Sequence, residues 1–370
     1  MKVALVHDYL REYGGAERVL EAIHDMFPSA PLYTAYYNSA SLGKNASKFK
    51  GWDIKTSFIQ NLPFANKLIS PLRIFAPVAF ENFDLKEYDL VISSSAIYFA
   101  KAVITSPQSL HIGYIHTPPR YLYGYTTSFN YKKHFLTKVF GELANHFLRL
   151  YDFETSQRPD ILVANSKNTL KRIQKFYRRD AQVIYPPVDL SEFKKVKKEK
   201  GDYFLSLGRL VRGKGVDVVI EASNRSGVVL KVAGNGPELE ELKKKAGKNI
   251  EFLGGVSDEE RVVLLSKAKA LVVASEDEDF GITNIEALAA GTPVIALKAG
   301  GYLETVIDGN TGEFFEGNRR EEVIDNLAAL LKSFNPNKYK EADLKKQAEK
   351  FSKEEFQKKL LDLIKKNIKV

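Results

Sequence analysis

The second half of the sequence alternates short apolar runs with segments of helical spacing. Each apolar run is followed by a loop that contains glycine or acidic residues, and then by a helix-like segment. Repeated strand–loop–helix units are typical of a doubly wound parallel sheet, because each helix carries the chain back to start the next parallel strand. This rhythm predicts an α/β domain with expected strands at 203–207, 228–233, 250–253, 271–274 and 292–296.

The first half is less regular, but it also contains apolar runs that end in small polar residues. These runs lie at 3–6, 88–94, 110–116 and 161–166. A chain of 370 residues holds about two domains. We therefore expect two Rossmann-like domains at 1–188 and 189–345, with a junction near the charged run that starts at Lys194. The segment 346–370 should form a C-terminal helix that packs back across the junction through Phe356, Leu360, Ile364 and Ile368.

The composition narrows the chemistry and the compartment. The chain contains no cysteine, which excludes disulfides, thiol nucleophiles and thiolate metal sites. No signal peptide is visible, and no apolar run is long enough to span a membrane. We therefore expect a cytoplasmic protein.

The charge is distributed unevenly. The net charge is +9, and no Asp or Glu occurs between Asp89 and Glu142. A basic stretch rich in aromatic residues predicts a face for an anionic membrane surface or a phosphorylated ligand, and so a protein peripheral on the cytoplasmic face. No nucleic-acid-binding motif is present, so nucleic acid is not an expected partner. The cations of this stretch are Lys101, Arg120, Lys132, Lys133 and Lys138.

A long amphipathic helix is expected between Lys132 and Phe153. Its apolar positions recur at helical spacing, which is more typical of core packing than of a membrane anchor. These positions are Leu136, Val139, Phe140, Leu143, Phe147, Leu150 and Tyr151.

Two glutamates with seven residues between them form the first candidate site. Glu278 lies on the loop after the run 270–274, and Glu286 lies at the start of an expected helix at 285–290. Ligands of open α/β sheets bind beyond the carboxyl ends of the strands, where these carboxylates could bind the hydroxyls of a sugar and a ribose. Gly281 allows the backbone to approach a ligand closely. The alternative is a solvated acidic loop with a glutamate that complements the helix dipole.

Other strand-end loops of the second half add cations and glycines. Arg209 and Lys214 suit a diphosphate, although they could be two ordinary surface cations. The motif Asp277-x-Asp279 resembles a metal site, but cations and a helix N-terminus could neutralise phosphates without a metal, so we expect no metal or other cofactor. The glycines at 234, 236, 254 and 255 either admit a flat base or form plain turns.

The first half offers two candidates of its own. Gly14 and Gly15 precede a helix and could admit a phosphate or a sugar, although a plain tight turn explains them equally well. His116 ends a strand next to Pro118 and Pro119, where it could hydrogen-bond a substrate hydroxyl. The alternative is a structural histidine that caps the loop.

Taken together, these motifs resemble the retaining glycosyltransferases of family 4, which have the GT-B fold. The resemblance is collinear over roughly residues 1–320, and the run His116 to Tyr121 is most similar to bacterial O-antigen and exopolysaccharide mannosyltransferases that use GDP-mannose. One departure is Asn284-Ile285, where many relatives have Pro-Val. The matching segments are 14–17, 116–120, 185–189, 208–209 with 214–215, 234–237, 278–286 and 300–312.

The resemblance implies two doubly wound domains that face each other across a cleft, and a role for each motif. Arg209 and Lys214 would hold the donor diphosphate, and Glu278 with the backbone at 280–282 (Phe280, Gly281, Ile282) would hold the transferred sugar. Glu286 would bind the ribose, and the acceptor would be a glycan or a lipid-linked glycan. The remaining implied contacts are His116 to the sugar, Gly14 and Gly15 to the phosphates, Gly234 and Gly236 beside the donor, and Gly255 and Val256 near the base.

Retention without a visible carboxylate nucleophile favours a front-face reaction in which the leaving phosphate takes the acceptor's proton. Three rivals remain at this stage. The donor could be a UDP-sugar, or the protein could be a nucleotide-sugar epimerase of the same fold. A non-catalytic nucleic-acid binder would explain the charge, but it would leave the ordered strand-end motifs unexplained.

Overall fold

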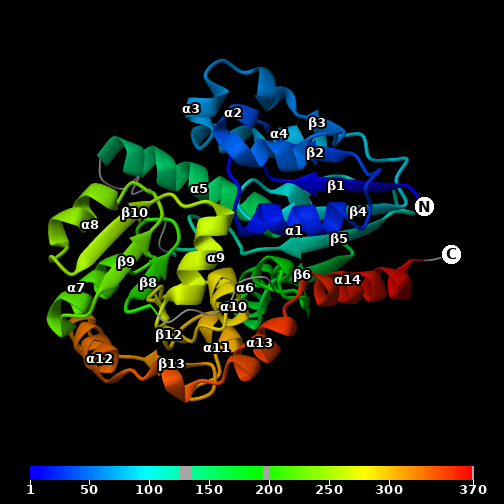
Figure 1. The fold of residues 1–370 in the computed structure, drawn as a ribbon. Helices are drawn as coiled ribbons and strands as arrows, with labels where there is room; N and C mark the ends of the chain where they lie inside the picture. The colour runs from blue at the N-terminus through cyan, green and yellow to red at the C-terminus, as the bar shows by residue number, and fades with distance from the viewer. Residues whose placement is uncertain (126–134, 195–200, 369–370) are drawn as a thin grey trace. The chain divides into compact units, whose positions relative to one another are not determined.

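The computed structural model describes residues 1–125, 135–194 and 201–368. The chain forms two compact units (Figure 1). Among the described residues, the first unit comprises 1–125, 135–187 and 356–368, and the second unit comprises 188–194 and 201–355. The C-terminal helix α14 (Lys353–Asn367) therefore begins in the second unit, and most of it belongs to the first.

In the first unit, the described residues form one sheet of seven parallel strands in the order β3-β2-β1-β4-β5-β6-β7. The order reverses between β1 and β4, which makes this position the topological switch point of the sheet. The strands are β1 (Val3–His7), β2 (Leu32–Thr34), β3 (Ile54–Thr56), β4 (Leu90–Ser95), β5 (Leu110–Ile115), β6 (Ile161–Ala164) and β7 (Gln182–Val183).

Successive residues of β1 serve opposite faces of this sheet, as the two-residue period of a strand requires. Ala4 and Val6 join one apolar cluster, and Leu5 joins the other. The first cluster lies under α3 (Ala65–Leu68), α4 (Ala76–Glu81) and α5 (Phe135–Thr155). The second lies under α1 (Gly15–His24), α2 (Ser39–Leu42) and α14, and α6 (Lys167–Tyr177) covers a smaller cluster.

Helix α14 supplies a substantial part of the second cluster. Phe356, Leu360 and Ile364 are buried, as their four-residue spacing predicts, and Leu363 is buried beside them. Its Gln357 side chain also donates a hydrogen bond of 3.0 Å to the Ala22 carbonyl of α1.

In the second unit, the described residues form a sheet of six parallel strands in the order β10-β9-β8-β11-β12-β13. The order again reverses once, between β8 and β11. The five strands expected from the sequence are present, and β13 is a sixth that the sequence analysis did not expect. The strands are β8 (Phe204–Leu207), β9 (Leu230–Ala233), β10 (Ile250–Gly254), β11 (Leu271–Val273), β12 (Val294–Leu297) and β13 (Gly312–Phe315).

Helices cover this second sheet as well. One apolar cluster lies under α7 (Val216–Ser226), α8 (Leu239–Lys245) and α12 (Arg320–Ser333). Helix α10 (Ile282–Ala289) packs against α9 (Asp258–Lys267), α11 (Tyr302–Thr305) and α13 (Glu341–Glu349). Both units are thus doubly wound α/β domains.

The long helix of the first unit is present, but its expected packing is wrong. Helix α5 buries Asn145, Asp152 and Thr155 and exposes Phe140 and Phe147. The apolar spacing predicted the helix correctly, whereas the face that enters the core is largely polar. The physical reason is a buried lysine beneath the helix, which binds the Asp152 carboxylate.

That lysine is Lys101, and its position corrects the expected basic face. Its side chain is 1% exposed and forms an ion pair with Asp152, so it cannot present charge at the surface. Arg120 is partly buried. Lys132 and Lys133, and the side chain of Lys138, lie outside the described residues. Within the part of the chain that the structure describes, no helix has the length and apolar character needed to cross a membrane.

Candidate active site

The switch point of the second sheet brings a lysine and a glutamate together. Lys214 follows β8 and Glu278 follows β11, and these two strands are neighbours in the sheet. The Lys214 ammonium donates a hydrogen bond of 2.7 Å to a Glu278 carboxylate oxygen. The lysine side chain is 34% exposed and the glutamate 15% exposed, so the pair remains open to water. Ligands of doubly wound sheets bind at this position, beyond the carboxyl ends of the strands.

Glycines allow the two loops to come this close. Gly215 has a φ of 68°, and a Cβ there would lie 2.2 Å from the Ala274 carbonyl oxygen at the end of β11. Gly300 and Gly301 approach the acidic loop from the β12 side, and the Gly301 N–H donates to the Glu278 carbonyl at 2.8 Å. A side chain at any of these positions would push the loops apart.

Two helix N-termini adjoin the pair. Gly215 is the N-cap of α7 and directly follows Lys214, while Gly281, with a φ of 93°, is the N-cap of α10. Ile282 is the first residue of α10, and its helix begins three residues earlier than the expected 285. Unpaired N–H groups at helix N-termini attract anions. Phe280 contributes only its backbone to this edge, because its ring is buried against Phe351.

Glu286 lies deeper than the sequence suggests. It is 3% exposed, and its carboxylate forms an ion pair with Arg261 of α9. The same guanidinium contacts Glu192 at 2.6 Å and Asp258 at 3.2 Å. Sequence reasoning missed Arg261, because it lies in the expected helix after the capping box and carries no motif of its own. Both candidate carboxylates therefore have cationic partners within the second unit.

The two glycines after β9 are closely packed against backbone. A Cβ at Gly234 would lie 1.8 Å from the Gly208 carbonyl oxygen, and one at Gly236 would lie 2.1 Å from the Leu210 oxygen. Gly255 lies against the Asn235 side chain, and Val256 next to it is partly exposed. The first two glycines are needed for packing between strand-end loops, which gives them a structural reason independent of a nucleotide.

Arg209 lies in the same loop as Lys214 and is exposed. The carbonyl of Arg209 accepts a hydrogen bond from the Val211 N–H at 3.0 Å, which tightens the loop. Its role at a diphosphate stays a prediction.

In the first unit, the switch point carries a buried chain of hydrogen bonds. His116 Nε2 and Ser94 Oγ are 2.8 Å apart, and the same Ser94 oxygen lies 3.0 Å from His7 Nδ1. His7 Nε2 in turn lies 3.5 Å from Glu17 of α1, whose other oxygen accepts from the Gly14 N–H at 2.7 Å. Burial, together with the neighbouring His7, lowers the pKa of His116 to about 4, so its imidazole is neutral at neutral pH.

These hydrogen bonds change how the candidate residues of the first unit are interpreted. His116 is buried with one ring nitrogen hydrogen-bonded to Ser94, so the structure supplies a structural role for it. Gly14 is the N-cap of α1 and Gly15 is its first residue. A role of these three residues at a donor remains a prediction.

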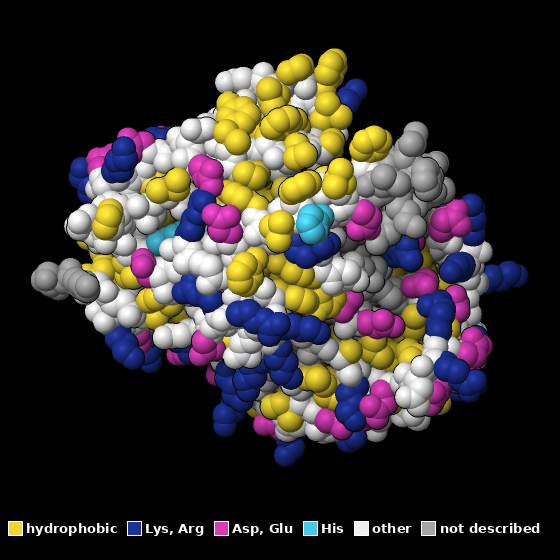
Figure 2. Space-filling model, turned by 180° about the vertical axis from the view of Figure 1, so that it is seen from behind, with side chains coloured by type: hydrophobic (Ala, Val, Ile, Leu, Met, Phe, Trp, Pro, Cys, Tyr) yellow, Lys and Arg dark blue, Asp and Glu magenta, His cyan; other side chains and the backbone are white. Residues whose placement is uncertain are grey.

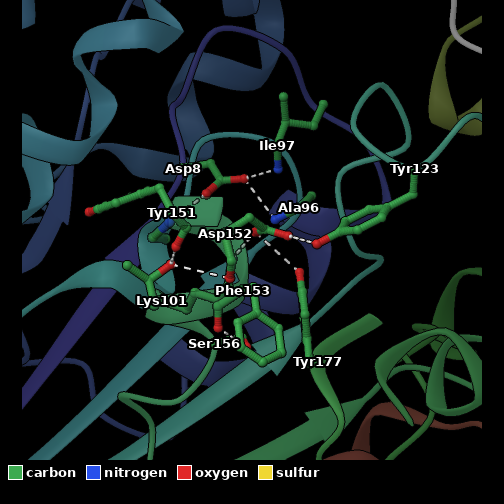
Figure 3. A network of polar contacts seen from close by, with 12 residues as sticks. Asp8, Ala96, Ile97, Lys101, Tyr123, Tyr151, Asp152, Phe153, Ser156 and Tyr177 are labelled. Carbon is green, nitrogen blue, oxygen red and sulfur yellow. Dashed lines mark hydrogen bonds and ion pairs between the residues drawn. The ribbon is translucent and has the colours of Figure 1, made fainter. Parts of the chain in front are cut away.

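A second carboxylate fixes the same edge of the first sheet. Asp8, which follows β1, accepts hydrogen bonds from the backbone N–H groups of Ala96, Ile97 and Ala100 (Figure 3). These bonds hold the loop after β4 against the end of β1. Three backbone hydrogen bonds thus anchor the loop after β4 to the end of β1.

The described residues contain no group of three or more His, Asp or Glu side chains arranged to hold a metal ion. The acidic run that includes Asp277 and Asp279 does not form such a group. A metal-independent reaction stays a prediction.

Comparisons with known proteins agree with this geometry. Residues 188–351 match the model of the family described as glycosyl transferases group 1. An uncharacterized glycosyltransferase of Methanocaldococcus jannaschii is 31% identical over 199 residues, which cover 52% of this chain and 56% of the relative. A GDP-mannose-dependent phosphatidylinositol monomannoside mannosyltransferase of Mycobacterium tuberculosis is 34% identical over 142 residues, covering 34% and 37% respectively. The chain thus spans about half or less of the length of these curated relatives.

A solved structure extends the likeness to the whole chain at the level of the fold. The Anabaena protein HepE, determined in complex with UDP and glucose, aligns over 99% of this chain and 100% of its own, with a TM-score of 0.73 and 17% identity. In this chain, each of the two parallel sheets reverses its strand order once. The chain has the GT-B fold, and its residues 188–351 are similar to the glycosyl transferases group 1 family.

Proposed function

We propose that the protein is a retaining glycosyltransferase that moves a hexose from a nucleotide diphosphate sugar to a glycan or lipid-linked glycan. The observation that carries this proposal is the Lys214–Glu278 pair at the switch point of the second sheet. A cation and a carboxylate lie side by side there, between the N-termini of α7 and α10. A nucleotide sugar needs both a partner for its diphosphate and an acceptor for its sugar hydroxyls.

Donor binding would exchange partners within this pair. The diphosphate would draw the Lys214 ammonium to itself, with Arg209 and the two helix N-termini as further positive groups. Glu278 would then be released to accept a hydrogen bond from a sugar hydroxyl. Because the pair is partly exposed, breaking it costs little, and the exchange is within the reach of ordinary binding energy.

The ribose is assigned to Glu286, with Arg261 as a positioning residue. The guanidinium is buried and held also by Glu192, so it fixes one carboxylate oxygen of Glu286. The other oxygen would accept from the ribose hydroxyls.

In the proposed front-face reaction, the bond from the anomeric carbon to the leaving phosphate oxygen breaks. A bond from that carbon to the acceptor oxygen forms on the same face. The acceptor's proton passes to the leaving phosphate, whose charge is stabilised by Lys214 and Arg209. Trapping a glycosyl adduct on a carboxylate of the protein would contradict this route.

The donor is proposed to be GDP-mannose. Support comes from the GDP-mannose-dependent relative of Mycobacterium tuberculosis and from the resemblance of the run His116 to Tyr121. A UDP-sugar is the alternative, favoured by the UDP complexes of the HepE structures. An epimerase of the same fold would convert the donor without an acceptor.

The experiment is a thermal-shift titration with GDP-mannose, GDP, UDP-glucose and UDP, followed by a product assay with and without acceptor. We expect GDP-mannose to raise the melting temperature, because a ligand that binds only the folded form stabilises it. The shift should vanish in Lys214→Ala and remain in Lys244→Ala. Lys244 is a matched control, because it donates a hydrogen bond of 2.6 Å to Glu241 on α8, close to the 2.7 Å of the Lys214–Glu278 pair. Conversion of the donor without acceptor would identify an epimerase, and no shift with any nucleotide would refute the proposal.

A further inference from the structure

The segments that connect the second unit to the rest of the chain both contact residues of the candidate donor site or their partners. Among the described residues, the chain enters the second unit at Val188 and leaves it after Glu355. We call residues 188–193 the entry segment and residues 351–355 the exit segment. Both belong to the second unit, so the contacts described below lie within one compact body.

The entry segment presents Glu192 from a short turn of 3-10 helix. The Asp189 carboxylate accepts hydrogen bonds from the Ser191 N–H at 2.9 Å and from the Ser191 hydroxyl at 2.6 Å, and the side chain of Phe193 is buried. Between these two anchors, the Glu192 carboxylate accepts a hydrogen bond of 2.6 Å from Nη2 of Arg261. The local fold of the segment therefore sets the position of this carboxylate.

Arg261 is bound by more carboxylates than its charge requires. Its side chain is 9% exposed, and its guanidinium contacts Glu192, Asp258 and Glu286. The first two carboxylates hold Nη2, and Glu286 is bound by Nη1. Because a guanidinium is planar and its donors are fixed relative to one another, holding Nη2 also fixes the direction in which Nη1 points.

Exposed ion pairs of the protein are of a different kind. Figure 2 shows acidic and basic side chains scattered among one another over the face that it presents. A pair such as Arg225 and Glu321, 2.6 Å apart with side chains 36% and 68% exposed, contributes little because water competes for both charges. Arg261 and Glu286 are buried, so a displaced guanidinium would leave the Glu286 carboxylate without its counter-charge.

The exit segment supports the start of α10. Phe351 is buried, and its ring packs edge-on against the ring of Phe280, with centroids 5.3 Å apart. Phe280 directly precedes Gly281, the N-cap of α10, and its backbone is proposed to lie against the transferred sugar. Phe351 also follows α13, which packs against α10. The exit segment is therefore positioned to fix the Phe280 backbone.

The two segments are hydrogen-bonded to each other. The Val188 N–H donates to the Phe351 carbonyl at 3.0 Å, and the Lys353 N–H donates to the Val188 carbonyl at 3.1 Å. Val188 and Ser352 thereby form a parallel bridge, and Val188 is buried. The supports of Glu286 and of the Phe280 backbone are therefore joined in one assembly.

We propose that the entry and exit segments are positioning elements of the donor site. Glu192 acts on the carboxylate of Glu286 through Arg261. Phe351 acts on the backbone of Phe280 through the contact between their rings. Neither Glu192 nor Phe351 contacts the donor itself. The inference rests on the proposed function, because it uses the roles proposed there for Glu286 and for the backbone at Phe280.

The test is isothermal titration calorimetry of the full chain with GDP, GDP-mannose and 2′,3′-dideoxy-GDP. Glu192→Ala should weaken the binding of GDP and of GDP-mannose equally, by about tenfold, because both ligands contain the ribose. It should leave the affinity for the dideoxy nucleotide unchanged, because that ligand lacks the hydroxyls that Glu286 is proposed to bind. Glu192→Gln keeps an acceptor oxygen at the same reach and should recover part of the lost affinity.

Phe351→Leu should give a different pattern. It should weaken GDP-mannose by about threefold to tenfold, from the packing lost beside Phe280, and leave GDP unchanged because GDP lacks the sugar. Two matched controls should bind as the parent does. Glu321→Ala removes a pair of the same 2.6 Å length, and Phe334→Leu removes an edge-on ring contact with Phe204 at 6.0 Å.

A second experiment tests the path through Arg261. In an Arg261→Gln background, Glu192→Ala should cause no further loss of affinity for GDP, because the residue through which Glu192 acts is already changed. A further loss would overturn the proposed path. Variants that bind every ligand as the parent does would overturn the inference, and so would variants that lose affinity for all three ligands equally, since that pattern indicates only a structural role.

These outcomes are distinguishable from failure of the proposed function. If the parent binds only uridine nucleotides, UDP, UDP-glucose and 2′,3′-dideoxy-UDP replace the three ligands, and the expected patterns are the same. A parent that binds neither series refutes the proposed function, and this inference with it. A parent that binds nucleotides, with variants that do not differ from it, overturns this inference alone.

Discussion

The two units share one topology, but the side chains at their switch points differ in exposure and charge. In the second unit, the loops after the first and fourth strands present a charged pair, Lys214 and Glu278, that remains open to water. In the first unit, the corresponding position holds a buried chain of hydrogen bonds through His7, Ser94 and His116. The same backbone arrangement can therefore leave a charged pair partly exposed at its edge or bury polar side chains in hydrogen bonds with one another.

The units also differ in where they bury charge. The first unit buries the ion pair Lys101–Asp152 under α5, with both side chains at or below 1% exposure. The largest expected effect follows from it. Asp152→Asn leaves a buried ammonium without its counter-charge and should lower the free energy of unfolding of the first unit by about 3–5 kcal/mol.

Urea unfolding followed by tryptophan fluorescence measures this loss, because Trp52, the single tryptophan of the chain, lies in the first unit. The double variant Lys101→Met, Asp152→Leu removes both charges and should recover most of the stability. A single variant as stable as the parent would show that the buried pair contributes nothing.

The second prediction expects a large loss of activity and a small loss of stability in the second unit. Lys214→Met and Glu278→Gln should each reduce transfer about 100- to 1000-fold, because they remove groups proposed to bind the reacting donor. Each should change stability by less than about 1 kcal/mol, because the pair is partly solvated. Steady-state transfer rates and melting curves on the same samples separate the two effects. An active variant would remove that residue from the proposed site.

The third prediction concerns acid. All six histidines of the chain precede residue 188, and none occurs from 188 to 355, the range of the second unit. Burial, with nearby arginines, lowers the pKa of His111 to about 3, and burial with His7 lowers that of His116 to about 4. Both lie below the ordinary histidine value near 6.5.

The sign follows from proton uptake. Between pH 6.5 and 4 the unfolded chain binds protons at these histidines and the folded chain does not, so stability falls as the pH falls. The loss should approach about 3 kcal/mol for each histidine by pH 4. Hydrogen exchange at pH 7 and 4.5 should show strands β4 and β5 losing more protection than β11 and β12. Equal losses in both sheets would contradict the assignment.

The smallest effect compares two buried serines. Ser94→Ala removes the oxygen shared by His7 and His116 and should cost about 1–3 kcal/mol. Ser275, just after β11, is also buried, but its hydroxyl has no hydrogen-bond partner among the described residues. Ser275→Ala should therefore be neutral or slightly stabilising in the same urea titration. Similar effects for the two serines would show that the histidine chain adds no stability.

The sequence predicted the second unit better than the first, for a physical reason. Buried parallel strands read as apolar runs, and five of the six strands of the second sheet have them. The sixth, Gly312–Phe315, contains only two apolar residues and was not expected. In the candidate site, the spacing located Lys214 and Glu278, but their mutual pairing depends on which strands are neighbours, and sequence order does not show that.

Long-range contacts explain the other differences. The inward face of α5 was predicted wrongly, because only the fold brings Lys101 under Asp152. Arg261 was not predicted as the partner of Glu286, because 25 residues separate them and no sequence motif links them. Periodicity reports which side of a helix is apolar, and it does not report what that side meets.

The return of α14 to the first unit has a consequence for biosynthesis. Phe356, Leu360, Leu363 and Ile364 complete an apolar cluster whose other buried members come from the first 184 residues. The nascent first unit therefore lacks part of its interior until residues 356–364 have left the ribosome, whereas the second unit is finished by Glu355. Domains fold as units during synthesis, so the C-terminal unit is expected to mature before the N-terminal one.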